Sequence, residues 1–112
     1  MYTASVEDYA LFAWVDQENP NDDTGYTLGS LTTAQVIALG PSLLKAQQAH
    51  GIMLPFVGRA QLSRSSVRAL IGVLEEDAAW QRDPHVCAAI DATLSILRVA
   101  SDLRVGVVWT TP

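Results

Sequence analysis

The sequence predicts a mainly α protein of four to five helices with a small β contribution at the C-terminus. Three observations predict this fold class: two long segments with apolar residues at helical spacing, several residue pairs typical of helix ends, and a final β-branched segment. The alternative is an α+β fold with a small antiparallel sheet. At 112 residues, the chain is expected to form a single compact domain over residues 1–112.

The first element has two possible assignments. Ser5 is a candidate N-cap, and apolar residues from Val6 to Trp14 follow i, i+3, i+4 spacing, which favours a helix. Aromatic residues and valine are also typical of strands, so a strand over Tyr9–Val15 is the alternative. Pro20 and its Asn, Asp and Gly neighbours end the element in either case.

Two helices are expected next. Thr32 and Gln35 have the spacing of a capping box, in which each side chain bonds the backbone N–H of the other residue. Pro41 interrupts this helix, because proline cannot donate to the backbone ladder, but it can begin a new helical turn. A second piece over Ser42–His50 is then closed by Gly51 as a C-terminal cap.

The two longest helices and a strand complete the chain. Val67–Gln81 carries an apolar stripe and follows several serines that are candidate caps. Asp83 before a proline is a strong start signal for a helix over Pro84–Leu103, and the two helices are expected to form an antiparallel hairpin. The β-branched segment Arg104–Thr110 is predicted to be a strand.

A single C-terminal strand needs a pairing partner. Three candidates are open: the apolar segment Ile52–Val57, which reads as a short strand or a buried connector, the segment Tyr26–Leu28, or another chain. Pairing with another chain would make the protein a structural or oligomeric subunit. The oligomeric state itself is left open.

Charge is unevenly distributed along the chain. Residues 1–44 contain six acidic residues and no Lys or Arg, whereas residues 45–112 contain seven basic and six acidic residues, which gives the net charge of −5. Localised charge steers a partner of opposite charge, and a neighbouring aromatic residue can anchor it. We therefore predict a binding surface for a cationic protein, although a solvated loop is the alternative. The predicted contact residues are Asp16, Glu18, Asp22, Asp23 and Tyr26.

Motifs for catalysis and metal binding are missing from the sequence. There is no G-x-S-x-G, no P-loop and no G-x-G-x-x-G. An EF-hand alignment of the acidic segment fails because Pro20 and Leu31 fall at ligand positions and offer no side-chain oxygen. Cys87, His50 and His85 lack the spacing of a zinc-ligand pair. We therefore expect no enzyme activity, no metal and no cofactor.

Other polar and aromatic residues are assigned by their context. The acidic run 75–77 is expected on an exposed helix face. Trp14 and Trp109 are expected in the core, whereas Trp80, at a helix end, is expected either in the core or at its rim.

Residues 31–51, LTTAQVIALGPSLLKAQQAHG, resemble the helix–turn–helix of small phage regulators and excisionases. The resemblance implies that the side chains facing DNA are Lys45, Gln47 and Gln48. Nearby cations available for phosphate contacts are Arg59, Arg64 and Arg68. Against this, a chain with a pI of about 4.7 lacks the basic footprint of most DNA-binding domains.

We expect a small acidic cytoplasmic protein that inhibits a protein partner by occlusion. An immunity protein that neutralises a basic toxin or nuclease, from a bacterium or phage, is the preferred hypothesis. A DNA-binding regulator and a structural subunit are the alternatives. No Lys or Arg precedes the first apolar stretch, so no signal peptide is expected, and the apolar runs are too short to span a membrane.

Overall fold

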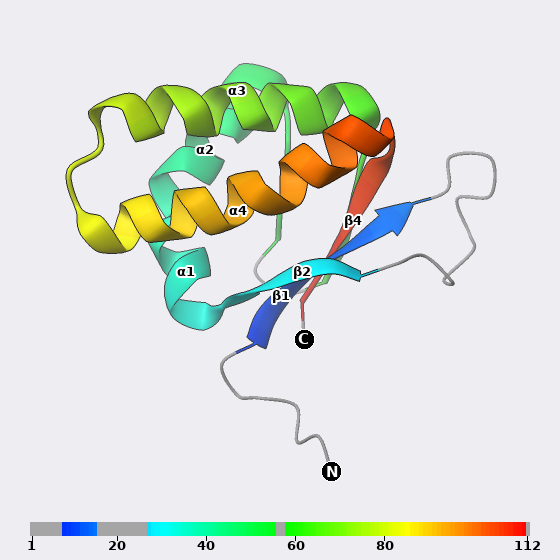
Figure 1. Ribbon diagram of the computed structural model, residues 1–112, viewed down its shortest axis with the longest axis horizontal. Helices are drawn as coiled ribbons and strands as arrows, with labels where there is room; N and C mark the ends of the chain where they lie inside the picture. The colour runs from blue at the N-terminus through cyan, green and yellow to red at the C-terminus, as the bar shows by residue number, and fades with distance from the viewer. Residues whose placement is uncertain (1–7, 16–26, 56–57, 112) are drawn as a thin grey trace, which may run out of the picture.

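A computed structural model describes residues 8–15, 27–55 and 58–111 of the chain (Figure 1). In chain order the elements are β1 (Asp8–Val15), β2 (Thr27–Thr32), α1 (Thr33–Ala38), α2 (Gly40–His50), β3 (Arg59–Leu62), α3 (Arg64–Trp80), α4 (Pro84–Leu103) and β4 (Gly106–Thr110). The predicted fold class, mainly α with four helices and a small β contribution, is confirmed.

The strands of the described residues form one antiparallel sheet in the order β2-β1-β4-β3. β1 lies inside this sheet, where Phe12 pairs with Trp109 of β4 and Leu11 with Ser30 of β2. The helix predicted from Ser5 is therefore wrong over Asp8–Val15, and the alternative strand is correct. Pairing on both sides satisfies the backbone groups of β1, which outweighs the helical spacing of its apolar residues.

β4 also lies inside the sheet, which corrects the predicted pairing of the C-terminal strand. Its partners are β1 and β3, and β2 pairs with β1 instead. The described part of Ile52–Val57, residues 52–55, forms neither helix nor strand, and β3 begins only at Arg59, in a strand that we did not predict. Because both edges of β4 are used within the chain, pairing of this strand with another chain is not available.

The helix ends follow the predicted local chemistry. At the start of α1, the Thr32 backbone N–H donates to Gln35 Oε1 at 2.8 Å and the Gln35 N–H donates to Thr32 Oγ1 at 3.1 Å, so the capping box is confirmed. Pro41 lies in the first turn of α2, and Gly51 closes that helix in the left-handed conformation with φ 68°. The side chain of Asp83 caps α4 by accepting from the His85 N–H at 2.9 Å.

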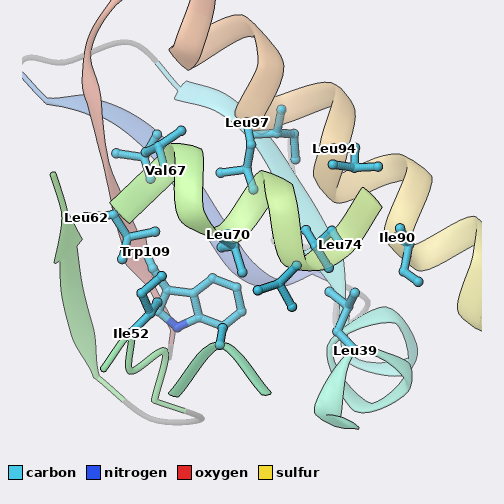
Figure 2. Packing of buried hydrophobic residues seen from close by; sticks show 14 of the residues in the cluster. Leu39, Ile52, Leu62, Val67, Leu70, Leu74, Ile90, Leu94, Leu97 and Trp109 are labelled. Carbon is cyan, nitrogen blue, oxygen red and sulfur yellow. The ribbon is translucent and has the colours of Figure 1, made fainter. Parts of the chain in front are cut away.

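The helices pack on the sheet face that carries Val107 and Trp109 (Figure 2). α3 contacts β3 and β4, α4 contacts β2 and β4, and α3 and α4 run side by side as the predicted hairpin (Figure 1). Trp109 is 1% exposed, and its Nε1–H donates to the Pro55 carbonyl at 2.8 Å. The same core contains the buried side chains that Figure 2 labels, which are Leu39, Ile52, Leu62, Val67, Leu70, Leu74, Ile90, Leu94 and Leu97.

None of the helices in the described ranges combines the length and the hydropathy needed to cross a bilayer.

Candidate functional site

The residues predicted to bind a partner fall in the connection between β1 and β2. Asp16, Glu18, Asp22, Asp23 and Tyr26 all lie within residues 16–26, outside the described residues. The strands on either side of this connection are paired with each other, and Ala13 and Thr27 form the pair nearest to it. The contact role of the five residues therefore stays a prediction.

Within the described residues, the most developed polar cluster is centred on Asp77 in α3. Its side chain is almost fully buried, and the whole residue is 3% exposed. Oδ2 accepts a hydrogen bond from Ser42 Oγ at 2.5 Å, and Oδ1 accepts one from Lys45 Nζ at 2.6 Å. Ser42 and Lys45 lie three residues apart on α2, so they occupy one face of that helix. The cluster therefore ties α2 to α3.

The ionisation of Asp77 is set by these contacts. Burial alone raises the pKa of its carboxyl, but the hydrogen bonds from Lys45, Ser42 and Trp80, together with the charge of Lys45, lower it more, so that the pKa lies below the ordinary value of 3.8. Asp77 is therefore a carboxylate at neutral pH, and its negative charge offsets the positive charge of Lys45.

This lowered pKa predicts acid-dependent stability. A carboxyl whose folded pKa lies below its unfolded value stabilises the fold above about pH 4, and that stabilisation is lost as pH falls through the folded pKa. We expect Asp77→Asn to lower the free energy of unfolding at pH 7 by about 2 kcal/mol and to flatten its dependence on pH below 4. Urea unfolding at pH 7 and pH 3 measures both effects.

The exposed Asp91 on α4 offers a matched control for this experiment. Asp91→Asn removes the same charge and should change stability by less than about 0.5 kcal/mol. A parallel loss of stability with falling pH in wild type and Asp77→Asn would show that Asp77 does not carry the acid response.

An open hollow lies next to this cluster, between α2 and α3. It has a volume of about 380 Å³, and we call it the α2–α3 hollow. The lining side chains include Lys45, Gln48, His50, Val73, Glu76 and Asp77. Trp80 adjoins it, because the Lys45 ammonium lies 4.7 Å from the centroid of the Trp80 ring. Trp80, which the sequence placed either in the core or at its rim, is 56% exposed and therefore lies at the rim.

The charges around the α2–α3 hollow do not balance. Lys45 is paired with Asp77, whereas the exposed Glu76 has no ion pair with any residue in the part of the chain that the structure describes. Its neighbour Glu75 is paired with Arg98 of α4 at 3.3 Å. One carboxylate, that of Glu76, is therefore available to a ligand.

A second, mainly apolar hollow lies on the other side of α2. Its volume is about 170 Å³, and it is lined by Gly40, Leu43, Leu44, Gln47, Ile52 and Leu54. The exposed side chains of Leu44 and Met53 come from the same two chain segments that line it. This apolar face carries no polar group that points to a ligand chemistry.

The segment that resembles a helix–turn–helix has a different geometry from that motif. Only Leu39 separates α1 from α2, whereas the motif joins its helices by a turn of three or four residues. Ser42 and Ala46 of α2 are buried, and the ammonium of Lys45 is engaged by Asp77. Of the side chains that the resemblance implies, Gln47 and Gln48 are exposed.

Residues considered for metal or nucleophilic chemistry are scattered. His50 lies in the last turn of α2 and His85 in the first turn of α4. The half-buried Cys87 is a free thiol that donates to the Gln81 carbonyl at 3.4 Å. In residues 8–15, 27–55 and 58–111, no three His, Cys, Asp or Glu side chains are placed to hold a metal ion together.

Sequence reasoning missed the role of Asp77, which was expected on an exposed face with Glu75 and Glu76. A signal was available, because Asp77 follows Leu74 by three residues and Leu70 by seven, which places it on the buried stripe of α3. An acid on an apolar stripe needs a buried partner. Which residues of α2 supply that partner depends on how the two helices pack.

Comparisons with protein families, with curated proteins and with solved structures found no match for this chain. The function of this chain is therefore inferred from the geometry and the charge of its own residues. The described residues around the α2–α3 hollow include the exposed indole of Trp80 at its margin and the carboxylate of Glu76 in its lining.

Proposed function

We propose that this protein is a small cytoplasmic inhibitor that binds a basic protein and blocks it by occlusion, as an immunity protein does with a toxin or nuclease. The observation that carries the proposal is the segregation of charge: residues 1–44 hold six carboxylates and no Lys or Arg. Four of these carboxylates lie in the connection between β1 and β2. Such a concentration of one sign of charge accelerates capture of a cationic partner.

The fold supports the proposal by anchoring this connection at both ends. β1 is paired with β2 on one side and with β4 on the other, so the acidic residues come from a framework of three paired strands. Exposed apolar side chains elsewhere on the molecule, such as Leu44 and Trp80, are candidates for the buried anchors that set the lifetime of a complex.

The proposal is tested by neutralising the acidic connection. The partner is the basic protein that co-purifies with this chain from its native host. We expect wild type to inhibit the activity of that partner at a one-to-one ratio. The variant Asp16→Asn, Glu18→Gln, Asp22→Asn, Asp23→Asn should bind with an association rate lower by about tenfold at low ionic strength, with a much smaller change in the dissociation rate. Stopped-flow measurements across salt separate the two rates.

A charge-matched control removes four carboxylates from the helical half of the chain. Its changes are Glu75→Gln, Asp83→Asn, Asp91→Asn and Asp102→Asn. We expect this variant to associate at nearly the wild-type rate. Equal slowing of both variants would assign the effect to net charge and reject the connection as the contact.

The alternative function, DNA binding, is tested by measuring the affinity of the protein for duplex DNA across salt concentrations. Tight, salt-sensitive binding to duplex DNA that Arg64→Ala and Arg68→Ala weaken would reject the inhibitor proposal. Those arginines lie one turn apart at the start of α3.

A further inference from the structure

We propose that the α2–α3 hollow receives an arginine side chain of the partner, with the guanidinium stacked on Trp80 and paired with Glu76. The inference rests on the proposed function, because it assumes a basic protein partner. The α2–α3 hollow is a different part of the chain from the acidic connection between β1 and β2. An experiment can therefore reject the arginine site without rejecting the proposed function, and the reverse.

Trp80 is unusually exposed for a tryptophan. Tryptophan has a large apolar surface, and Trp109 of the same chain is 1% exposed, whereas Trp80 is 56% exposed. Tryptophan, with tyrosine and arginine, is enriched among the residues that dominate protein–protein binding energy. Trp80 closes α3 at the margin of the α2–α3 hollow, where a partner side chain can cover the ring.

A cation of the chain itself, the Lys45 ammonium, already lies between Asp77 and the Trp80 ring. The Lys45 ammonium lies 2.6 Å from Asp77 Oδ1 and 4.7 Å from the centroid of the Trp80 ring. A carboxylate on one side and an indole face on the other are the two groups that stabilise a desolvated cation. The indole remains more than half exposed with Lys45 in place, so a second cation can reach it.

The charge of the α2–α3 hollow is complementary to that of a cationic side chain. Lys45 and Asp77 neutralise each other, so that among the described residues lining the α2–α3 hollow Glu76 is the carboxylate without an ion pair, with His50 as the other titratable side chain. Glu76 and Trp80 are four residues apart on α3 and therefore lie on the same face of that helix. A cationic side chain that enters the hollow meets the Glu76 carboxylate, and the Trp80 ring lies at the margin beside Lys45.

Arginine fits this pair of groups better than lysine does. The guanidinium is planar, stacks on an indole and presents a fork of N–H donors to a carboxylate, whereas an ammonium is a compact and strongly hydrated charge. The hollow, at about 380 Å³, lies near the lower end of ligand pockets, which span roughly 300–1,000 Å³. Its size suits one long side chain.

The experiment uses a hexa-arginine peptide as the probe and the indole N–H resonance of Trp80 as the local readout. Two-dimensional 15N NMR resolves this signal from those of Trp14 and Trp109, and Trp80→Phe assigns it. We expect a saturable shift with hexa-arginine, a weaker one with hexa-lysine and none with hexa-citrulline, which keeps the shape of arginine without its charge. No shift with hexa-arginine, or an equal shift with hexa-citrulline, would overturn the inference.

Two neighbouring glutamates provide a charge-matched comparison. Glu76→Gln should weaken binding of hexa-arginine about fivefold. Glu75→Gln removes the same charge one residue away, but Glu75 is paired with Arg98, so its loss should leave the affinity within about twofold. Equal weakening by the two variants would show general attraction to an acidic protein and reject the site.

Substitution of Trp80 separates the aromatic contribution from apolar contact. Because Trp80 is exposed, both Trp80→Phe and Trp80→Leu should leave the fold intact, which circular dichroism checks. Isothermal titration with hexa-arginine should show that Phe keeps most of the affinity, whereas Leu lowers it about fivefold. Unchanged affinity in Trp80→Leu would overturn the inference.

The same variants distinguish failure of the site from failure of the proposed function. If the native partner is inhibited equally by wild type and Trp80→Leu, the arginine site is rejected and the inhibitor function stands. If hexa-arginine binds as expected but the co-purifying protein is neither basic nor inhibited, the proposed function is rejected and the arginine-binding chemistry stands.

Discussion

Replacing Trp109 with alanine should lower the free energy of unfolding by about 4 kcal/mol. The Trp109 side chain is 1% exposed and lies where β4, α3 and the segment around Ile52 meet (Figure 2). Its truncation leaves a large cavity in the core and removes the donor that bonds the Pro55 carbonyl at 2.8 Å. Because small domains are stable by only about 5–15 kcal/mol, this loss is a large share of the total.

Chemical denaturation of three variants measures this effect and its parts. Trp109→Phe keeps a buried ring but loses the N–H donor, so its cost should be smaller, about 2 kcal/mol. Trp80→Ala serves as the matched control, because it truncates an exposed tryptophan and should cost less than about 1 kcal/mol. If Trp109→Ala were as mild as Trp80→Ala, the central place of Trp109 in the core would be contradicted.

The second large effect is expected at Gly106, the first residue of β4. A Cβ atom at this position would meet the carbonyl oxygen of Leu62 far inside van der Waals contact, and that oxygen belongs to the backbone of the neighbouring strand. Since a backbone atom cannot rotate away, the strands β3 and β4 would have to separate next to the Leu62–Val107 pair. We expect Gly106→Ala to lower the free energy of unfolding by about 3 kcal/mol.

Gly72 is the control for this substitution. It lies exposed within α3, and a Cβ atom there would have no neighbour within 4 Å. Gly72→Ala should therefore stabilise the protein by about 0.5–1 kcal/mol, because alanine loses less backbone freedom than glycine in a helix. Thermal unfolding of the two variants should give shifts of opposite sign. A stabilising Gly106→Ala would contradict the close approach of β3 to β4.

The residues of the candidate site could be predicted singly from the sequence, but their contacts could not. Trp80 was recognised as a helix-end residue and Lys45 as a cation on α2, but neither was connected to Asp77. Lys45 precedes Asp77 by 32 positions and Ser42 precedes it by 35, and only the packing of α2 on α3 brings these residues together. Charge counts along the chain predicted the acidic connection without any such knowledge, because net charge needs no geometry.

The helix ends were determined by the sequence itself. Thr32 and Gln35 bond each other across three residues, Gly51 adopts a left-handed conformation that residues other than glycine rarely adopt, and Asp83 caps the helix that starts at Pro84. Each of these interactions lies within one helical turn, so its free energy depends on neighbours that are adjacent in the chain. The predicted bounds Pro84–Leu103 are those observed, whereas α2 begins at Gly40 and α3 at Arg64, before their predicted first residues Ser42 and Val67.

The strands were decided by the tertiary structure. β1 has residues that suit either a helix or a strand, and it is a strand because β2 and β4 supply partners for its backbone on both sides. β3 is only four residues long and was not predicted, since its pairing with β4 begins 45 residues away in the chain, at Leu62 and Val107. Strand formation and the burial of Asp77 depend on contacts between distant segments, and those contacts form only when the whole chain folds.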